Sequence, residues 1–152
     1  MTIDERDGVL YLGGALDEAS MLGELPARAR DGRIVLDLEK VTFINSLGVR
    51  DWIRMMAALD RAKTAVELRR VCEPVVQQLN MILAARGDAA VASFFAPYAC
   101  DSCGREESML VDAVAFHDTL VAGVAPPQTC PECGSKMSFN DFPERYFSFL
   151  SV

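Results

Sequence analysis

Two short cysteine pairs constrain the fold of this chain more than any other feature. Each pair has the spacing Cys-x-x-Cys followed by glycine, at 100–104 and at 130–134. This spacing brings two thiolates onto one tight turn, and two such turns supply the four sulfurs of a tetrahedral Zn²⁺ site. Gly104 and Gly134 suit the positive φ that such turns need.

We therefore predict a structural zinc site whose four thiolates leave no coordination position for water or substrate. Its predicted ligands are Cys100, Cys103, Cys130 and Cys133. A thiol redox switch formed by the same two pairs is the alternative. The fifth cysteine, Cys72, lies in an apolar stretch and is interpreted as a small core residue.

The N-terminal residues, the lack of long apolar runs and the net charge indicate where the protein acts and what it does not bind. The first seven residues include three acidic side chains and one Arg, and they lack the basic start and apolar stretch of a secretory signal. No run of about 18 apolar residues follows. We therefore expect a cytoplasmic protein, where reducing conditions favour metal ligation over disulfides. A net charge of −7 argues against non-specific binding to nucleic acid or to an anionic membrane.

Strand and helix patterns alternate through about residue 98. Apolar runs predict strands at 8–13, 33–38, 64–72 and 89–95. Helices are expected over 18–31, from Ser46 onward, and from Glu73 to a stop at Gly87. The alternation predicts an α/β domain at 1–98, with helices packed on a mixed sheet.

The remaining residues, 99–152, are predicted to form a small zinc ribbon that includes a strand at 108–114. The C-terminal stretch 139–150 is dense in aromatic residues. We expect these rings to form the core of the ribbon or to dock it onto the sheet domain, because so small a unit buries little by itself. An exposed partner-binding patch is the alternative.

The stretch 34–50, Ile-Val-Leu-Asp-Leu-Glu-Lys-Val-Thr-Phe-Ile-Asn-Ser-Leu-Gly-Val-Arg, resembles the STAS family, the anti-sigma factor antagonists of bacteria and their relatives. The earlier Gly-Ala-Leu-Asp at 14–17 is similar to a second family motif. Val66–Leu68 and Pro74–Val76 fit a later strand and helix of that fold. The resemblance covers roughly residues 3–96 and implies a STAS-like fold for them.

The resemblance also implies a function centred on one serine. The family's regulatory serine corresponds to Ser46, whose phosphorylation by a partner kinase switches binding to the kinase or to an anti-sigma factor. The implied contact site comprises Asn45, Ser46, Gly48, Val49 and Arg50, with Arg54 further along the same helix. Asn45 stands where the family usually has Asp, so one carboxylate is missing. The alternative is that Asn45 and Ser46 only cap the helix.

No motif supports an enzyme. The single histidine, His117, is interpreted as a partly exposed residue, and no nucleophile or phosphate-binding loop accompanies it. We therefore predict a non-enzymatic regulatory module for protein–protein interactions, similar to anti-sigma factor antagonists. A zinc-ribbon adaptor of the transcription or nucleic-acid machinery and a thiol redox-sensing regulator are the alternatives.

Overall fold

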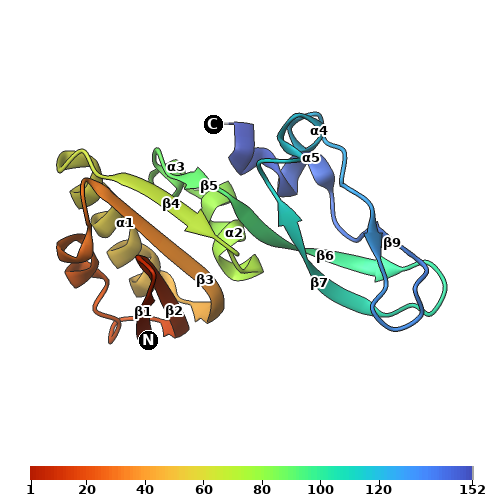
Figure 1. Ribbon diagram of the computed structural model, residues 1–152, viewed down its shortest axis with the longest axis horizontal. Helices are drawn as coiled ribbons and strands as arrows, with labels where there is room; N and C mark the ends of the chain where they lie inside the picture. Colours follow the sequence, from red (N-terminus) through yellow and green to blue (C-terminus); the bar gives the residue numbers. More distant parts are fainter. Residues whose placement is uncertain (152) are drawn as a thin grey trace.

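The computed structural model describes residues 1–151 as an elongated molecule with two packed parts (Figure 1). The first part holds a five-stranded sheet with the strand order β1-β2-β3-β4-β5. Its strands are β1 (Thr2–Arg6), β2 (Val9–Leu16), β3 (Arg33–Ile44), β4 (Ala65–Arg69) and β5 (Ala90–Val91). Strands β2 to β5 are parallel and β1 is antiparallel to β2, so the sheet is mixed.

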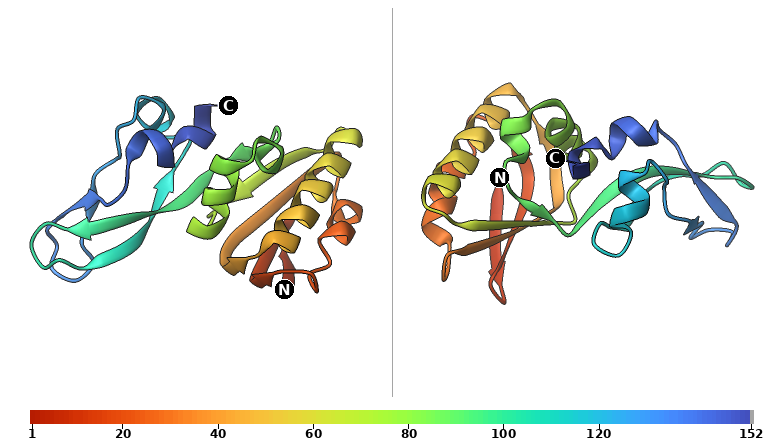
Figure 2. Two further views of the ribbon diagram at one scale, coloured as in Figure 1. Left: turned by 180° about the vertical axis from the view of Figure 1, so that it is seen from behind. Right: turned by 90° about the horizontal axis from the view of Figure 1, so that it is seen from above.

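Helices cover one face of this sheet, as the view from behind in Figure 2 shows. They are η1 (Leu22–Arg28, a 3-10 helix), α1 (Ser46–Arg61), α2 (Glu73–Met81) and α3 (Leu83–Arg86). Alternate residues of β3, such as Leu36, point to this face and join Trp52 of α1 in the core. The Trp52 indole N–H donates to the carbonyl of Ala85 at 2.9 Å, which fixes α3 against α1.

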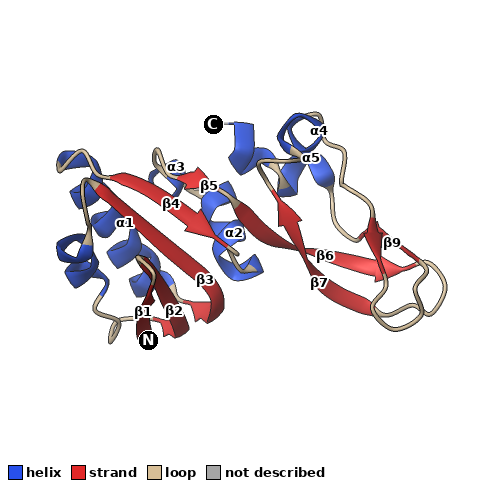
Figure 3. Cartoon of the chain, viewed as in Figure 1, coloured by secondary structure: helices blue, strands red, loops and turns tan. Residues whose placement is uncertain are grey.

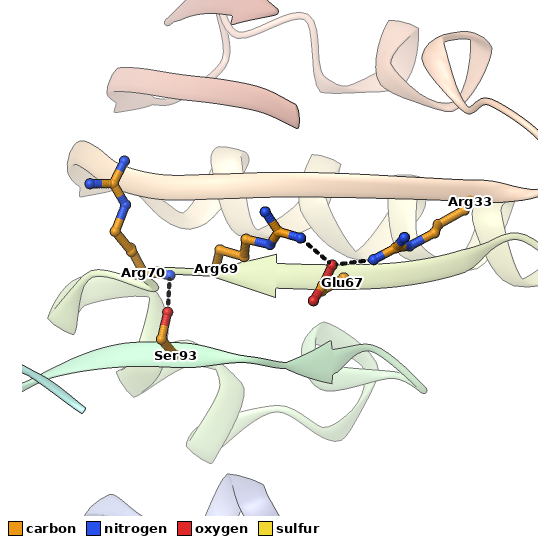
Figure 4. A network of polar contacts seen from close by, with 5 residues as sticks. All are labelled: Arg33, Glu67, Arg69, Arg70 and Ser93. Carbon is orange, nitrogen blue, oxygen red and sulfur yellow. Dashed lines mark hydrogen bonds and ion pairs between the residues drawn. The ribbon is translucent and has the colours of Figure 1, made fainter. Parts of the chain in front are cut away.

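The opposite face of the sheet is polar. Glu67 accepts hydrogen bonds from Arg33 and Arg69 at 2.5 and 3.1 Å, and Figure 4 shows these side chains side by side across β3 and β4. Arg70 donates to the buried carboxylate of Asp37 at 2.6 Å. Because parallel strands are usually covered on both faces, this charged face distinguishes the sheet from a doubly covered one.

The second part is a four-stranded antiparallel sheet with short helices beside it (Figure 3). Its strand order is β7-β6-β9-β8, with β6 (Ser93–Cys100), β7 (Glu106–Asp112), β8 (Gln128–Thr129) and β9 (Lys136–Phe139). The helices are α4 (His117–Val121), α5 (Pro143–Tyr146) and η2 (Ser148–Ser151, a 3-10 helix).

The C-terminal segment joins the two parts. The ring of Phe94 on β6 packs edge-on against Phe149 at 5.1 Å, and both side chains are fully buried. Asn80 of α2 donates to the carbonyl of Tyr146 and accepts from the N–H of Phe149, while Arg86 of α3 donates to the carbonyl of Phe149. One continuous apolar cluster therefore runs through both parts. This packing confirms the docking expected for the aromatic stretch, with Phe142 as the exposed exception.

The mixed α/β architecture is confirmed, but several predicted elements differ in extent. The helix expected over 18–31 is a single 3-10 segment of seven residues, because Pro26 lies inside it and lacks an N–H for the α-helical ladder. The helix expected from Glu73 to Gly87 breaks at Ile82, whose φ of −132° is extended. That break turns α3 so that buried Arg86 reaches the C-terminal segment.

The strand expected at 89–95 is two strands. β5 pairs with β4 in the first sheet, whereas β6 belongs to the second sheet and contacts the first part through an isolated bridge to Val71, whose carbonyl accepts from the N–H of Phe95. The proposed boundary at 98/99 falls inside β6, which runs on to Cys100. Strand β1 was not predicted, because its charged sequence lacks an apolar pattern.

Candidate metal centre and candidate contact site

The four cysteines of the two pairs meet at the far end of the second sheet. Their sulfur atoms all lie within 4.8 Å of one another. The Sγ atoms of Cys100 and Cys133 are 3.4 Å apart, and those of Cys103 and Cys130 are 3.8 Å apart. The four residues thus form a cluster that is compatible with a metal ion.

Each pair is held by the same backbone turn. The N–H of Gly104 donates to the carbonyl of Cys100, and the N–H of Gly134 donates to the carbonyl of Cys130. Both glycines have φ near +73°, as the sequence predicts. The first cysteine of each turn is buried and the second is exposed, so the cluster has an inner and an outer side.

The surroundings of the thiols affect their protonation. Ser135 and the neighbouring sulfur of Cys100 lower the pKa of Cys133 to about 6. Two backbone N–H groups, of Ser102 and Cys103, point at the sulfur of Cys100 at 3.4 Å. By contrast, the backbone donor of Arg105 is outweighed by the three neighbouring sulfurs and by burial, which raise the pKa of Cys103 to about 11. The thiolate is the form that binds metals.

The remaining candidate ligands lie outside this cluster. His117 begins α4, and its side chain is half exposed beside Asp118. Cys72 is buried, as expected, and burial raises the pKa of its thiol. It also occupies the N-cap position of α2, directly before the helix start expected at Glu73, and its side chain makes no capping hydrogen bond.

The predicted contact site lies where β3 ends and α1 begins. Asn45 is the N-cap of α1, and its side-chain oxygen accepts from the N–H of Gly48 at 2.8 Å. Its own N–H donates to the carbonyl of Leu16 at 3.1 Å, which ties the start of the helix to the end of β2. Ser46 follows as the first helical residue and is exposed.

Sequence reasoning missed one residue of this site, Glu18. Its carboxylate accepts from the side-chain amide of Asn45 at 3.0 Å, and this hydrogen bond lowers the pKa of Glu18. Glu18 directly follows the Gly-Ala-Leu-Asp stretch, which was the available signal. A carboxylate is therefore hydrogen-bonded to residue 45 although that residue is itself an amide.

The other predicted contact residues are partly buried and partly exposed. Gly48 and Val49 are buried, so they pack the helix and do not face a partner. A Cβ at position 48 would lie 2.1 Å from the carbonyl oxygen of Leu16, so only glycine fits this approach. Arg50 is exposed and held by Asp51 at 2.9 Å, and Arg54 reaches the same carboxylate at 3.8 Å.

Exposed apolar side chains flank Ser46. Phe43 at the end of β3 is 51% exposed and Leu47 on α1 is 40% exposed. Met21, in the loop that carries Glu18, is 59% exposed. Large apolar side chains at one chain junction are typical of a contact surface when they gather around a polar centre.

No family model matches the chain, and no curated protein matches it. The resemblance to STAS proteins thus rests on the residues at 14–17, 34–50, 66–68 and 74–76. Within residues 1–151, no helix combines the length and the apolar character that crossing a bilayer requires.

Proposed function

We propose that this chain is a STAS-like regulatory module, cytoplasmic and without catalytic activity, that binds protein partners through the surface around Ser46. One observation carries the proposal: Ser46 is exposed in the first turn of α1, between the exposed side chains of Phe43 and Leu47. A hydroxyl at that position is open to modification, and the apolar neighbours supply area for a partner.

The helix start favours a switch by phosphorylation. The N–H groups at the beginning of α1 and its dipole favour negative charge there. A phosphate on Ser46 would be one helical turn from Arg50, within reach of a charge-assisted hydrogen bond. It would also follow Asn45 directly in the chain, and its charge would repel the Glu18 carboxylate that Asn45 holds. Phosphorylation would therefore change both the charge and the polar contacts of the surface.

The ribbon's role in this proposal is structural. A tetrahedron with metal–sulfur bonds of about 2.3 Å has edges of about 3.8 Å. The observed sulfur separations of 3.4 and 3.8 Å fit such a tetrahedron, and a set of four thiolates from two Cys-x-x-Cys turns is typical of structural Zn²⁺ sites. Bound there, Zn²⁺ would clamp β6 to β9 through the two turns, and its filled coordination sphere would supply no catalysis.

The phosphorylation switch is tested in the native cell. The protein is enriched from growing and stressed cells, and the occupancy of phosphate on Ser46 is read by mass spectrometry. Partners are then purified on wild type and on Ser46→Asp. We expect phosphate in at least one condition, and loss or exchange of a partner with Ser46→Asp.

Thr119→Asp is the matched control, because Thr119 is an exposed hydroxyl residue on α4, in the second part of the molecule. It should retain the wild-type partners. The switch is refuted if Ser46 carries no phosphate in any condition and Ser46→Asp binds the same partners as wild type. Leu47→Asp distinguishes the contact surface from the phosphorylation switch. If the surface binds a partner but Ser46 is not a switch, Leu47→Asp would still lose that partner.

A further inference from the structure

A groove separates the first turn of α2 from the exposed side of β6 and β7. Two adjoining cavities of about 300 and 260 Å³ form it, and both are lined by Glu73 and Ser108. Its ends are marked by Glu39 and Asn140. The groove is independent of the surface around Ser46, because the two share no lining residue.

The groove is acidic. Its lining includes no Lys or Arg but four carboxylates, those of Glu39, Glu73, Glu106 and Glu107. Glu39 pairs with Arg70 and Glu107 pairs with Arg105. Glu73 and Glu106 have no ion-pair partner among residues 1–151. The groove thus presents two carboxylates whose charge is not neutralised.

The floor between these carboxylates is apolar. Pro74, Phe95 and Pro97 line the two cavities. Apolar surface rimmed by carboxylates suits Lys and Arg, whose long stems pack on apolar atoms while the charged group meets an anion. Charge and shape together therefore point to a cationic side chain.

The backbone of β7 points to the form of the ligand. The N–H of Phe95 donates to Val71, away from β7, so Phe95 and its partner Leu110 are a pair that makes no hydrogen bonds to each other. By alternation, Glu106, Ser108 and Leu110 direct their N–H and C=O groups to the free side of β7. The side-chain amide of Gln128 donates to the carbonyl of Leu110. The remaining outward N–H and C=O groups of these three residues have no backbone partner within residues 1–151.

Strand β7 also lacks three features that commonly block a free edge, a Lys, a Pro and a β-bulge, and its charged side chains are all carboxylates. Its sequence, Glu-Glu-Ser-Met-Leu-Val-Asp, holds no Lys and no Pro, and its register with β6 is regular. A free edge of this kind pairs with an extended polypeptide, whose main chain supplies the missing hydrogen bonds.

A second copy of this chain fits the edge poorly. In the antiparallel register that pairs all seven residues of two β7 strands, Glu106 faces Asp112 of the other copy, and like charges opposite each other destabilise a strand pair. The net charge of −7 adds repulsion between copies. A basic strand meets neither obstacle.

We propose that the groove and the free edge of β7 bind an extended, Lys- or Arg-bearing segment of another polypeptide, which adds to β7 as a strand and directs cationic side chains to Glu73 and Glu106. The segment's main chain pairs with Ser108 and its neighbours on the free edge. Its cationic side chains lie over the apolar floor.

The test uses the full, metal-loaded chain and a heptapeptide with blocked termini. Lys stands at every second position of the peptide, and Val or Thr stands at the positions between. Binding is followed at low salt by amide chemical shifts and by hydrogen exchange. We expect shifts confined to β7 and the first turn of α2, and slower exchange of the Ser108 and Leu110 amide protons. The same peptide with Glu in place of Lys should not bind.

Two variants test the carboxylates and the edge separately. Glu73→Gln combined with Glu106→Gln should weaken binding by about five- to thirtyfold, as expected for two partly exposed charge pairs. The matched control, Glu24→Gln with Glu144→Gln, removes two exposed carboxylates outside the groove and should stay within about twofold of wild type.

Ser108→Pro removes one outward N–H without removing a β6–β7 hydrogen bond, so the chain should fold and lose the peptide, whereas Ser108→Ala should retain it. Thermal unfolding of each variant confirms the fold. The proposal is overturned by no binding at millimolar peptide, by equal binding of the Glu peptide, by shifts elsewhere, or by equal losses in the control pair.

Discussion

Replacing Gly48 by alanine is the sharpest test of how the contact site is built. An added Cβ would lie 2.1 Å from the carbonyl oxygen and 2.6 Å from the carbonyl carbon of Leu16. Both atoms belong to the backbone of β2, so no side chain can rotate away to make room. The Cβ is about 1.3 Å short of the 3.4 Å at which ordinary contact begins.

The expected cost follows from these contacts. Forcing the helix start away from β2 costs about 1–3 kcal/mol as overpacking. It also weakens the hydrogen bond from Asn45 to Leu16, for about another 1 kcal/mol. The better helix propensity of alanine returns at most about 1 kcal/mol. After the full propensity gain, Gly48→Ala should therefore lower the free energy of unfolding by about 1–3 kcal/mol, and Tm by about 2–12 °C.

Urea and thermal unfolding of the metal-loaded chain measure this change. Gly23→Ala is the matched control, because a Cβ at Gly23 meets nothing within 4 Å. It should be neutral or slightly stabilising. A Gly48→Ala protein as stable as wild type, or as stable as Gly23→Ala, would refute the close approach of α1 to β2.

Three further outcomes are expected. Cys130→Ser should lower the bound metal from one ion per chain and lower Tm, as measured by elemental analysis and calorimetry; full metal content in the variant would contradict the cluster. Phe149→Ala should cost about 3–5 kcal/mol in urea unfolding, because its ring is fully buried between the two parts, whereas Phe142→Ala should cost less than about 0.5 kcal/mol. Asn45→Asp should raise the pKa of Glu18, because a carboxylate replaces the amide donor that lowers it. Wild type should then be more stable to unfolding than Asn45→Asp at neutral pH, and this difference in stability should disappear as pH falls through the pKa of Glu18. An NMR titration of Glu18 that is the same in both proteins would contradict this reasoning.

Short-range patterns predicted the local features well. Cys-x-x-Cys-Gly spacing fixes the backbone turn by itself, so the conformations of Gly104 and Gly134 followed from the sequence. The cap at Asn45 and the stop at Gly87 depend on residues within one helical turn, and both are present. The apolar run at 33–38 predicted the central strand, although β3 continues to Ile44.

Contacts between distant segments were not predictable in the same way. Glu18 and Asn45 are 27 residues apart, and their hydrogen bond exists because β2 and β3 lie side by side and parallel. The continuous core of the two parts depends on η2 reaching Asn80 and Arg86, more than 60 residues earlier. No local periodicity records such a pairing.

The sequence by itself determined the turns, the caps, the two Cys-x-x-Cys pairs and the alternation of strands and helices, because each depends on residues that are neighbours along the chain. Only the tertiary structure decided which edge and face of each sheet stay uncovered. It left the outer edge of β7 without a backbone partner and opened the groove between β7 and Glu73. These features follow from how the two parts pack, since burial and free hydrogen-bonding groups are properties of the whole fold.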